Sequence, residues 1–223
     1  MKRFALLVCA ILTAAGPVSG DVPDCEALAE RAALEEGIPP GLMTAIARVE
    51  SGRTVQGRFR AWPWTLNNAG NGSYHPDKDT ALAALDQMLA SGIRNVDIGC
   101  MQINWRWHSG AFGDAVSMMD PVENTRYAAR FLRALHDRHG DWTQAVEHYH
   151  SSDPERGRSY AQRVDRHLPE DPTDAGDNRL AQAAPVHAAR GLVAGGGRGS
   201  LLAPAAGALV TIEAQLHAGF RYR

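Results

Sequence analysis

The chain has 223 residues, of which 44% are hydrophobic and 22% charged, and its formal net charge at pH 7 is −2. This composition suits one globular domain with a sizeable core plus additional segments. The near-neutral balance excludes a global basic surface of the kind that binds nucleic acid, so we expect no nucleic-acid partner.

The first twenty residues have the layout of a secretory signal. Lys2 and Arg3 precede an apolar run at residues 4–15, and small residues follow it. We expect cleavage after Gly20, which leaves the mature chain in the periplasm. The apolar run is too short to span a bilayer as a mature helix, and an uncleaved anchor is the alternative interpretation.

Removing this segment also removes Cys9, so two cysteines remain, Cys25 and Cys100. In an oxidising compartment a single pair of cysteines most simply forms a disulfide. Closing so long a loop is worth on the order of 4 kcal/mol in the chain-entropy account. The alternative is a catalytic thiol, which needs a reduced thiolate and a neighbouring base.

Residues 21–168 predict a series of helices with a small β element. Helix start signals are Asp24, the prolines at 39 and 40, Asp79 or Thr80, Asp120, Asp141 and Asp153, and glycine stop signals are Gly37, Gly52, Gly92 and Gly140. Residues 61–75, "AWPWTLNNAGNGSYH", place aromatic residues on both sides of an Asn/Gly-rich turn and predict a β-hairpin. The fold class is therefore mainly α, of the α+β type, with a β-hairpin inserted.

The C-terminal part has a different composition. Residues 169–223 are rich in Ala, Gly, Pro and Asp, which rarely build a core. We expect a disordered low-complexity tail, with a segment that orders on contact with a partner as the functional alternative.

The helix expected before Gly52 ends in a carboxyl group. Met43, Ile46 and Glu50 recur at i, i+3 and i+7, so Glu50 leaves the helix from its apolar face. Burial and the negative end of the helix dipole both disfavour the anion and raise the pKa. A carboxyl group that stays protonated near neutral pH can act as a general acid, and we expect the Ser51 hydroxyl to orient it. The alternative is an ion pair at the helix end with Arg48, Arg53 or Arg58.

A second polar motif is "GCMQIN" at residues 99–104. Gln102 and Asn104 alternate with Met101 and Ile103, and on an extended segment the two amides would share one face. Amide groups donate and accept hydrogen bonds, which suits sugar hydroxyls and N-acetyl groups.

These motifs, followed by "YAARFL" at 127–132 and "HYHSSDPERGRSYAQRV" at 148–164, resemble the soluble lytic transglycosylase family across residues 21–168. The resemblance implies a lysozyme-like fold and cleavage of the β-1,4 bond between N-acetylmuramic acid and N-acetylglucosamine in peptidoglycan. Such enzymes leave 1,6-anhydro muramyl ends and add no net water.

By motif position the resemblance implies a role for each site residue. Glu50 acts as acid and then as base, and Ser51 helps to hold it. Met101, Gln102 and Asn104 line the sugar groove. Tyr149 lies near the acid, and His150 stands where relatives have Asn, so we expect it to serve as a polar contact. These positions are the expected site: Glu50, Ser51, Met101, Gln102, Asn104, Tyr149 and His150.

Other interpretations remain open. Asp97 is the best candidate for a second acid, and a muramidase or chitinase type of hydrolase would use it to position water. A non-catalytic glycan-binding or assembly protein is the third possibility. Trp62 and Trp64 suit either stacking on sugar rings or packing within the hairpin.

We expect no cofactor and no metal ion, because the histidine pairs have no third ligand at a recognisable spacing. The expected partner is the peptidoglycan glycan strand. Relatives of this kind accompany flagella and secretion systems, so flagellar rod or secretion-system components are candidate partners of the tail.

Overall fold

The structure is a computed structural model, and it describes residues 22–169. The expected signal segment and most of the expected tail, residues 170–223, lie outside the described residues. Within 22–169 the helices are α1 (Cys25–Glu36), α2 (Leu42–Ser51), α3 (Lys78–Ala90), α4 (Trp105–His108), α5 (Ala115–Met119), α6 (Pro121–His139), α7 (Trp142–His150) and α8 (Pro154–Asp165), with a 3-10 turn at Ser109–Ala111. The strands are β1 (Gly52–Val55), β2 (Arg58–Ala61), β3 (Thr65–Asn68), β4 (Asn71–Tyr74), β5 (Val96–Ile98) and β6 (Ile103–Asn104).

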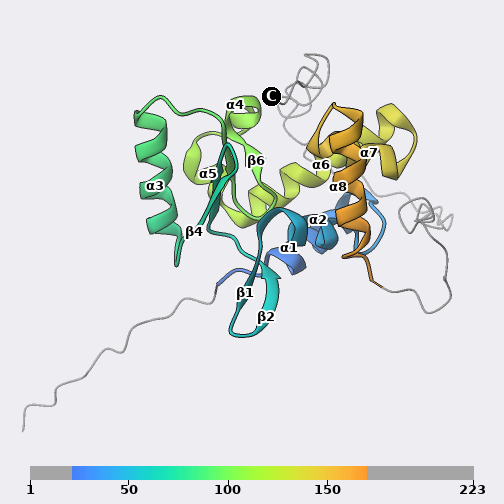
Figure 1. The fold of residues 1–223 in the computed structure, drawn as a ribbon, viewed down its shortest axis with the longest axis horizontal. Helices are drawn as coiled ribbons and strands as arrows, with labels where there is room; N and C mark the ends of the chain where they lie inside the picture. The colour runs from blue at the N-terminus through green and yellow to red at the C-terminus, as the bar shows by residue number, and fades with distance from the viewer. Residues whose placement is uncertain (1–21, 170–223) are drawn as a thin grey trace, which may run out of the picture.

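The molecule has a helical part and a sheet part (Figure 1). Helix α1 packs on α2 and α6, α7 packs on α6 and α8, and α8 returns to α2. Strands β4, β3, β5 and β6 form an antiparallel sheet, and α3 lies beside β3. The expected mainly helical, lysozyme-like α+β fold is confirmed.

Most helix boundaries follow the expected capping residues. Asp24, Asp120, Asp141 and Asp153 each accept backbone N–H groups of the first turn of their helix. The expected start of α3 at Asp79 or Thr80 is wrong. Asp77 is the N-cap, and its carboxylate accepts the Thr80 N–H at 2.8 Å, so Asp79 lies inside the first turn.

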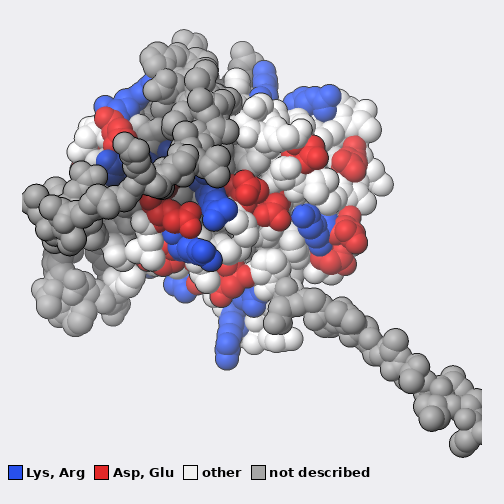
Figure 2. All heavy atoms as spheres, turned by 180° about the vertical axis from the view of Figure 1, so that it is seen from behind, with Lys and Arg blue, Asp and Glu red and all other residues white. Residues whose placement is uncertain are grey.

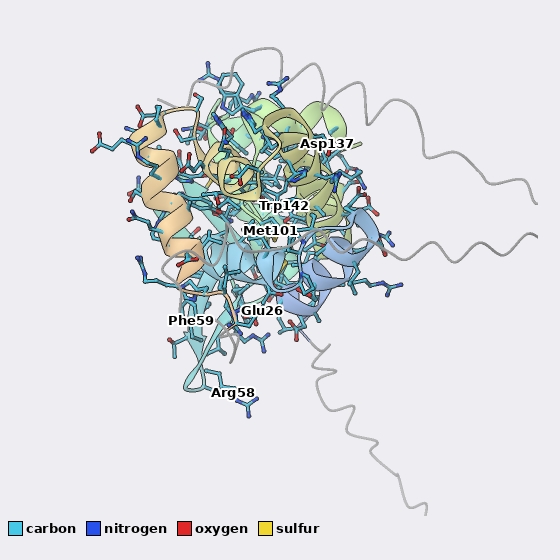
Figure 3. The ribbon with its side chains drawn as sticks, turned by 90° about the vertical axis from the view of Figure 1, so that its right-hand side faces the viewer. Glu26, Arg58, Phe59, Met101, Asp137 and Trp142 are labelled. Carbon is cyan, nitrogen blue, oxygen red and sulfur yellow. A yellow bond between two sulfur atoms is a disulfide. The ribbon has the colours of Figure 1, made fainter. Side chains whose placement is uncertain are left out.

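The hairpin expected at residues 61–75 is confirmed as the β3–β4 pair, which turns through Ala69 and Gly70 with positive φ angles of 49° and 94°. A second hairpin, β1–β2, was not anticipated. It begins at Gly52, directly after α2, and turns through Gln56 and Gly57 at φ 50° and 77°. Figure 3 shows it projecting from the body of the molecule, with Arg58 at its tip.

The predicted disulfide is confirmed. Cys25 on α1 and Cys100 in the β5–β6 connection are bonded, with their Cα atoms 5.5 Å apart, and both side chains are buried. The bond ties the sheet part to the helical part. On the face shown in Figure 2, basic and acidic side chains are interspersed. No helix among residues 22–169 is both long enough and apolar enough to cross a membrane.

Candidate active site

Glu50 lies in the last turn of α2, at the junction of the two parts. Leu42, Met43 and Ile46 on the same helix are fully buried, whereas Glu50 keeps part of its surface exposed. Burial raises the pKa of Glu50 from 4.5 to about 8, against the lowering effect of a hydrogen bond from Tyr160. The charge of Asp97 raises the pKa further, and Arg163 lowers it. The carboxyl group is therefore protonated at neutral pH, on a residue that keeps part of its surface exposed.

Glu50 does not form the ion pair with Arg48, Arg53 or Arg58 that was the alternative interpretation of its position. Arg48 bonds to Glu26 at 2.8 Å, and the Arg53 guanidinium lies over the Trp62 ring at 5.0 Å. Among the described residues, none of the ion pairs includes Glu50. The carboxyl group is thus held by a hydroxyl group and not by a cation.

That hydroxyl belongs to Tyr160, which the sequence analysis did not place in the site. The Tyr160 O–H donates to Glu50 Oε1 at 2.5 Å, and its ring is only 1% exposed. Burial, followed by the Glu50 charge, raises the pKa of Tyr160 well above its ordinary value, so the phenol remains a donor. The sequence feature that could have pointed to Tyr160 is the motif "SYAQRV". This motif lies on α8, which packs against α2.

Tyr149 lies beside Tyr160, the residue that bonds to the acid, and its hydroxyl bonds to the backbone. Its hydroxyl donates to the Met101 carbonyl oxygen at 3.0 Å, and the side chain is 8% exposed. Its ring lies nearly parallel to the Tyr160 ring, with centroids 6.5 Å apart. Tyr149 therefore holds the chain around Met101, while Tyr160 holds the acid.

The "GCMQIN" segment is not extended as expected. Residues 99–102 form a tight turn, and only Ile103 and Asn104 are in strand β6. Gly99 and Gln102 have positive φ angles of 80° and 46°, which turn Gln102 away from the face it would share with Asn104. The Gln102 amide donates to the carbonyl oxygens of Thr65 at 3.2 Å and Gly99 at 3.0 Å.

Asn124 on α6 fixes this turn, although no sequence pattern marked it as a site residue. The fully buried amide accepts the Met101 N–H at 2.9 Å and donates to the carbonyls of Ile98 and Met118, each at 3.0 Å. A Cβ at Gly99 would lie 3.0 Å from the Asn124 amide nitrogen, so this close approach requires glycine.

Three residues of the expected site are buried. Ser51 and Met101 are 0% exposed, and Asn104 is 1% exposed. The Ser51 hydroxyl bonds to the carbonyls of Ala47 and Cys100, the latter at 2.7 Å, and not to Glu50. The expected roles are corrected accordingly: these side chains support the site from beneath, because they have no surface left for a glycan.

Asp97 stands in a row of polar side chains across the sheet. The register pairs Asp97 on β5 with Asn67 on β3 and with Asn104 on β6. The Asn104 amide donates to Asp97 Oδ1 at 2.7 Å, and the Asn67 amide donates to Oδ2 at 3.2 Å. Burial raises the pKa of Asp97 to about 6, although both hydrogen bonds lower it.

His150, the last residue of α7, covers Tyr160. Their rings are parallel within 2°, with centroids 4.5 Å apart. Burial, aided by Arg163 and Arg156, lowers the pKa of His150 to about 4, so the imidazole is neutral at physiological pH.

The two candidate tryptophans are packed inside the sheet part. Trp62 is 7% exposed and Trp64 is 6% exposed. The Trp62 indole N–H donates to the His75 carbonyl oxygen at 2.7 Å. This burial favours hairpin packing over stacking on sugar. Within residues 22–169 no three His, Cys, Asp or Glu side chains are grouped to hold a metal ion.

Comparison with known families agrees with this geometry. The family model of the transglycosylase SLT domain matches residues 27–167, so the chain belongs to the SLT transglycosylase family. The match spans Glu50, the 99–102 turn and Tyr160, and it supports an enzyme that cleaves peptidoglycan glycan strands. No curated protein sequence and no solved structure matches the chain significantly.

Proposed function

We propose that this chain is a lytic transglycosylase that cleaves the β-1,4 bond between N-acetylmuramic acid and N-acetylglucosamine and leaves 1,6-anhydro muramyl ends. Glu50 serves as acid and then as base. The observation that carries the proposal is a partly exposed glutamic acid residue whose carboxyl group is protonated at neutral pH and whose Oε1 is held at 2.5 Å by the Tyr160 hydroxyl.

The first step is protonation of the leaving oxygen. Because Oε1 already accepts a hydrogen bond from the Tyr160 hydroxyl, the acidic proton of Glu50 is carried by Oε2, where it can be transferred. Its transfer to the glycosidic oxygen breaks the bond to C1, and the departing sugar leaves with a free hydroxyl group. The muramyl N-acetyl oxygen stabilises C1 by bonding to it from the opposite face.

The second step returns the proton. Glu50, now a carboxylate, takes the proton of the muramyl 6-hydroxyl, and O6 attacks C1 to displace the N-acetyl oxygen. Glu50 is protonated again and no water is consumed. The Tyr160 hydrogen bond stabilises the transient carboxylate, since an O–H donor bonds more strongly to an ionised acceptor.

A second candidate function is hydrolysis. Asp97 interacts electrostatically with Glu50 and has a pKa of about 6, so at neutral pH it is mostly ionised and able to position water. Hydrolysis requires two carboxyl groups, one protonated and one ionised. The pair Glu50 and Asp97 offers this combination.

Mass analysis of digested peptidoglycan distinguishes the candidates. Anhydro muramyl ends support the transglycosylase, reducing ends support the hydrolase, and uncut strands support a non-catalytic glycan-binding protein. The same digest with Glu50→Gln is the matched control, and cleavage by that variant would contradict the role of Glu50.

We further propose that the chain acts in the periplasm and serves the insertion of an envelope appendage, such as a flagellum or a secretion system. The support is the secretory layout of residues 1–20 and the composition of residues 169–223. Affinity capture with the full mature chain, compared with a chain ending at residue 169, tests the second part. Capture of the same rod or secretion components by both chains, or by neither, would contradict a tail-mediated role.

A further inference from the structure

An open hollow of about 490 Å³ lies beside the catalytic acid and has no role in the mechanism above. It is formed where α7 ends and α8 begins. Its lining residues are His150, Asp153, Glu155, Arg156, Ser159 and Arg163.

The hollow is one side chain away from Glu50. Tyr160, which bonds to Glu50, is covered by the His150 ring at 4.5 Å and by the Arg163 guanidinium at 5.3 Å from the ring centroid. His150 and Arg163 thus contact the Tyr160 ring on one side and line the hollow on the other. A ligand in the hollow would therefore lie against His150 and Arg163, one layer of side chains behind the acid.

The lining is mostly charged and contains no Phe, Tyr or Trp. Arg156, Ser159 and Arg163 recur on one exposed face of α8, and neither arginine takes part in the ion pairs found among residues 22–169. Asp153 is engaged as the cap of α8, whereas Glu155 is exposed in the first turn. Sugar rings prefer aromatic platforms, but guanidinium groups select carboxylates.

We propose that this hollow binds the short peptide attached to the muramyl unit, with Arg156 and Arg163 bonding to its carboxylates. The proposal rests on the proposed peptidoglycan substrate. Each muramyl sugar bears such a peptide next to the cleaved bond, and the peptide carries free carboxylates and commonly one amine. Glu155 at the same rim is placed to pair with the amine, so both charge types of the peptide find an opposite charge.

A kinetic experiment uses the full mature protein on two substrates: glycan strands with intact peptides and strands stripped by an amidase. Arg156→Gln should lower the ratio of kcat/KM for peptide-bearing over stripped strands about tenfold, because one charge-assisted contact is lost. Arg158→Gln is the matched control, since Arg158 is exposed on the same helix and does not line the hollow. An unchanged ratio in Arg156→Gln, or an equal fall in Arg158→Gln, would overturn the proposal.

A binding experiment separates this proposal from the cleavage chemistry. The peptide L-Ala-γ-D-Glu-meso-diaminopimelic acid, without sugar, is titrated into the ¹⁵N-labelled mature protein. We expect amide shifts concentrated at residues 150–163 and at least tenfold weaker binding to Arg156→Gln. Such binding stands even if no cleavage is observed, whereas shifts that are absent, or equal in both proteins, contradict the hollow as a peptide site.

Discussion

Two carboxyl groups, one in the helical part and one in the sheet part, interact electrostatically, and their surroundings differ. Glu50 comes from an apolar helix and receives one hydroxyl hydrogen bond, from Tyr160. Asp97 comes from a sheet and receives two amide hydrogen bonds, from Asn67 and Asn104. Burial raises both pKa values, to about 8 and about 6. Burial is the largest cause at both groups and hydrogen bonds oppose it at both, and the result is that Glu50 stays protonated at pH 7 while Asp97 is mostly ionised.

The largest effect is expected at Glu50. Glu50→Gln keeps the shape of the side chain and removes the proton that the reaction needs, so kcat should fall about 10³-fold or more. The melting temperature at pH 5 should change little, because wild-type Glu50 is also uncharged there. Muropeptide release and thermal melts on the same preparations provide the measurement. Substantial turnover by Glu50→Gln would mean that another residue is the general acid.

The Cys25–Cys100 disulfide links the helical part to the sheet part. Removing it tests how much this link contributes to the stability of the junction at the site. Cys25→Ala with Cys100→Ala should lower the free energy of unfolding by on the order of 4 kcal/mol. The Cys100 carbonyl that accepts the Ser51 hydroxyl at 2.7 Å would also be less restrained. Denaturant titration measures the loss. A double variant as stable as the wild-type protein would show that packing alone fixes this junction.

Removing the Tyr160 hydroxyl should widen the difference between the pKa values of Glu50 and Asp97. Tyr160→Phe deletes the hydrogen bond that lowers the pKa of Glu50, so this pKa should rise further. The descending limb of the pH-rate profile should then move to higher pH, and kcat should fall roughly tenfold, because the carboxylate formed in the reaction loses its donor.

Tyr149→Phe is the control for this variant, since the Tyr149 hydroxyl bonds to the Met101 carbonyl oxygen and not to Glu50. It should leave the position of the limb unchanged. A shift of equal size in both variants would mean that general loosening, and not the direct bond, causes the effect.

The smallest effect is expected at Asp97. Asp97→Asn removes a negative charge that raises the pKa of Glu50, so the descending limb should move slightly to lower pH while anhydro ends remain the product. Mass analysis alongside the pH-rate profile checks both results. Loss of all cleavage with an intact fold would instead favour the hydrolytic role of Asp97.

Local patterns were sufficient for much of the fold. Capping aspartates, glycine stops and an Asn/Gly turn act over a few residues, so they predicted most helices and the β3–β4 hairpin. The β1–β2 hairpin was not predicted: its turn residues, Gln56 and Gly57, lie only a few residues beyond the helix end at Gly52, and its two strands have four residues each.

The site was harder to predict, because its parts come from distant segments. The apolar helix face singled out Glu50, but an ion pair at the helix end stayed open until the motifs as a set resembled a known family. The bond from Tyr160 crosses 110 residues, and the three bonds of Asn124 depend on how α6 meets the 99–102 turn. The alternation of Gln102 and Asn104 pointed to an extended strand, but tertiary contacts place Gln102 in the left-handed region and bury Asn104 beside Asp97.

The most direct test of the account is the titration of Glu50 in the folded protein, followed by ¹³C NMR of side-chain carboxyl groups with Glu50→Gln to assign the signal. The account predicts a pKa of about 8, held up by burial and by the charge of Asp97. A carboxyl group that titrates near 4.5 would be ionised at neutral pH, could not donate the first proton, and would contradict the central claim.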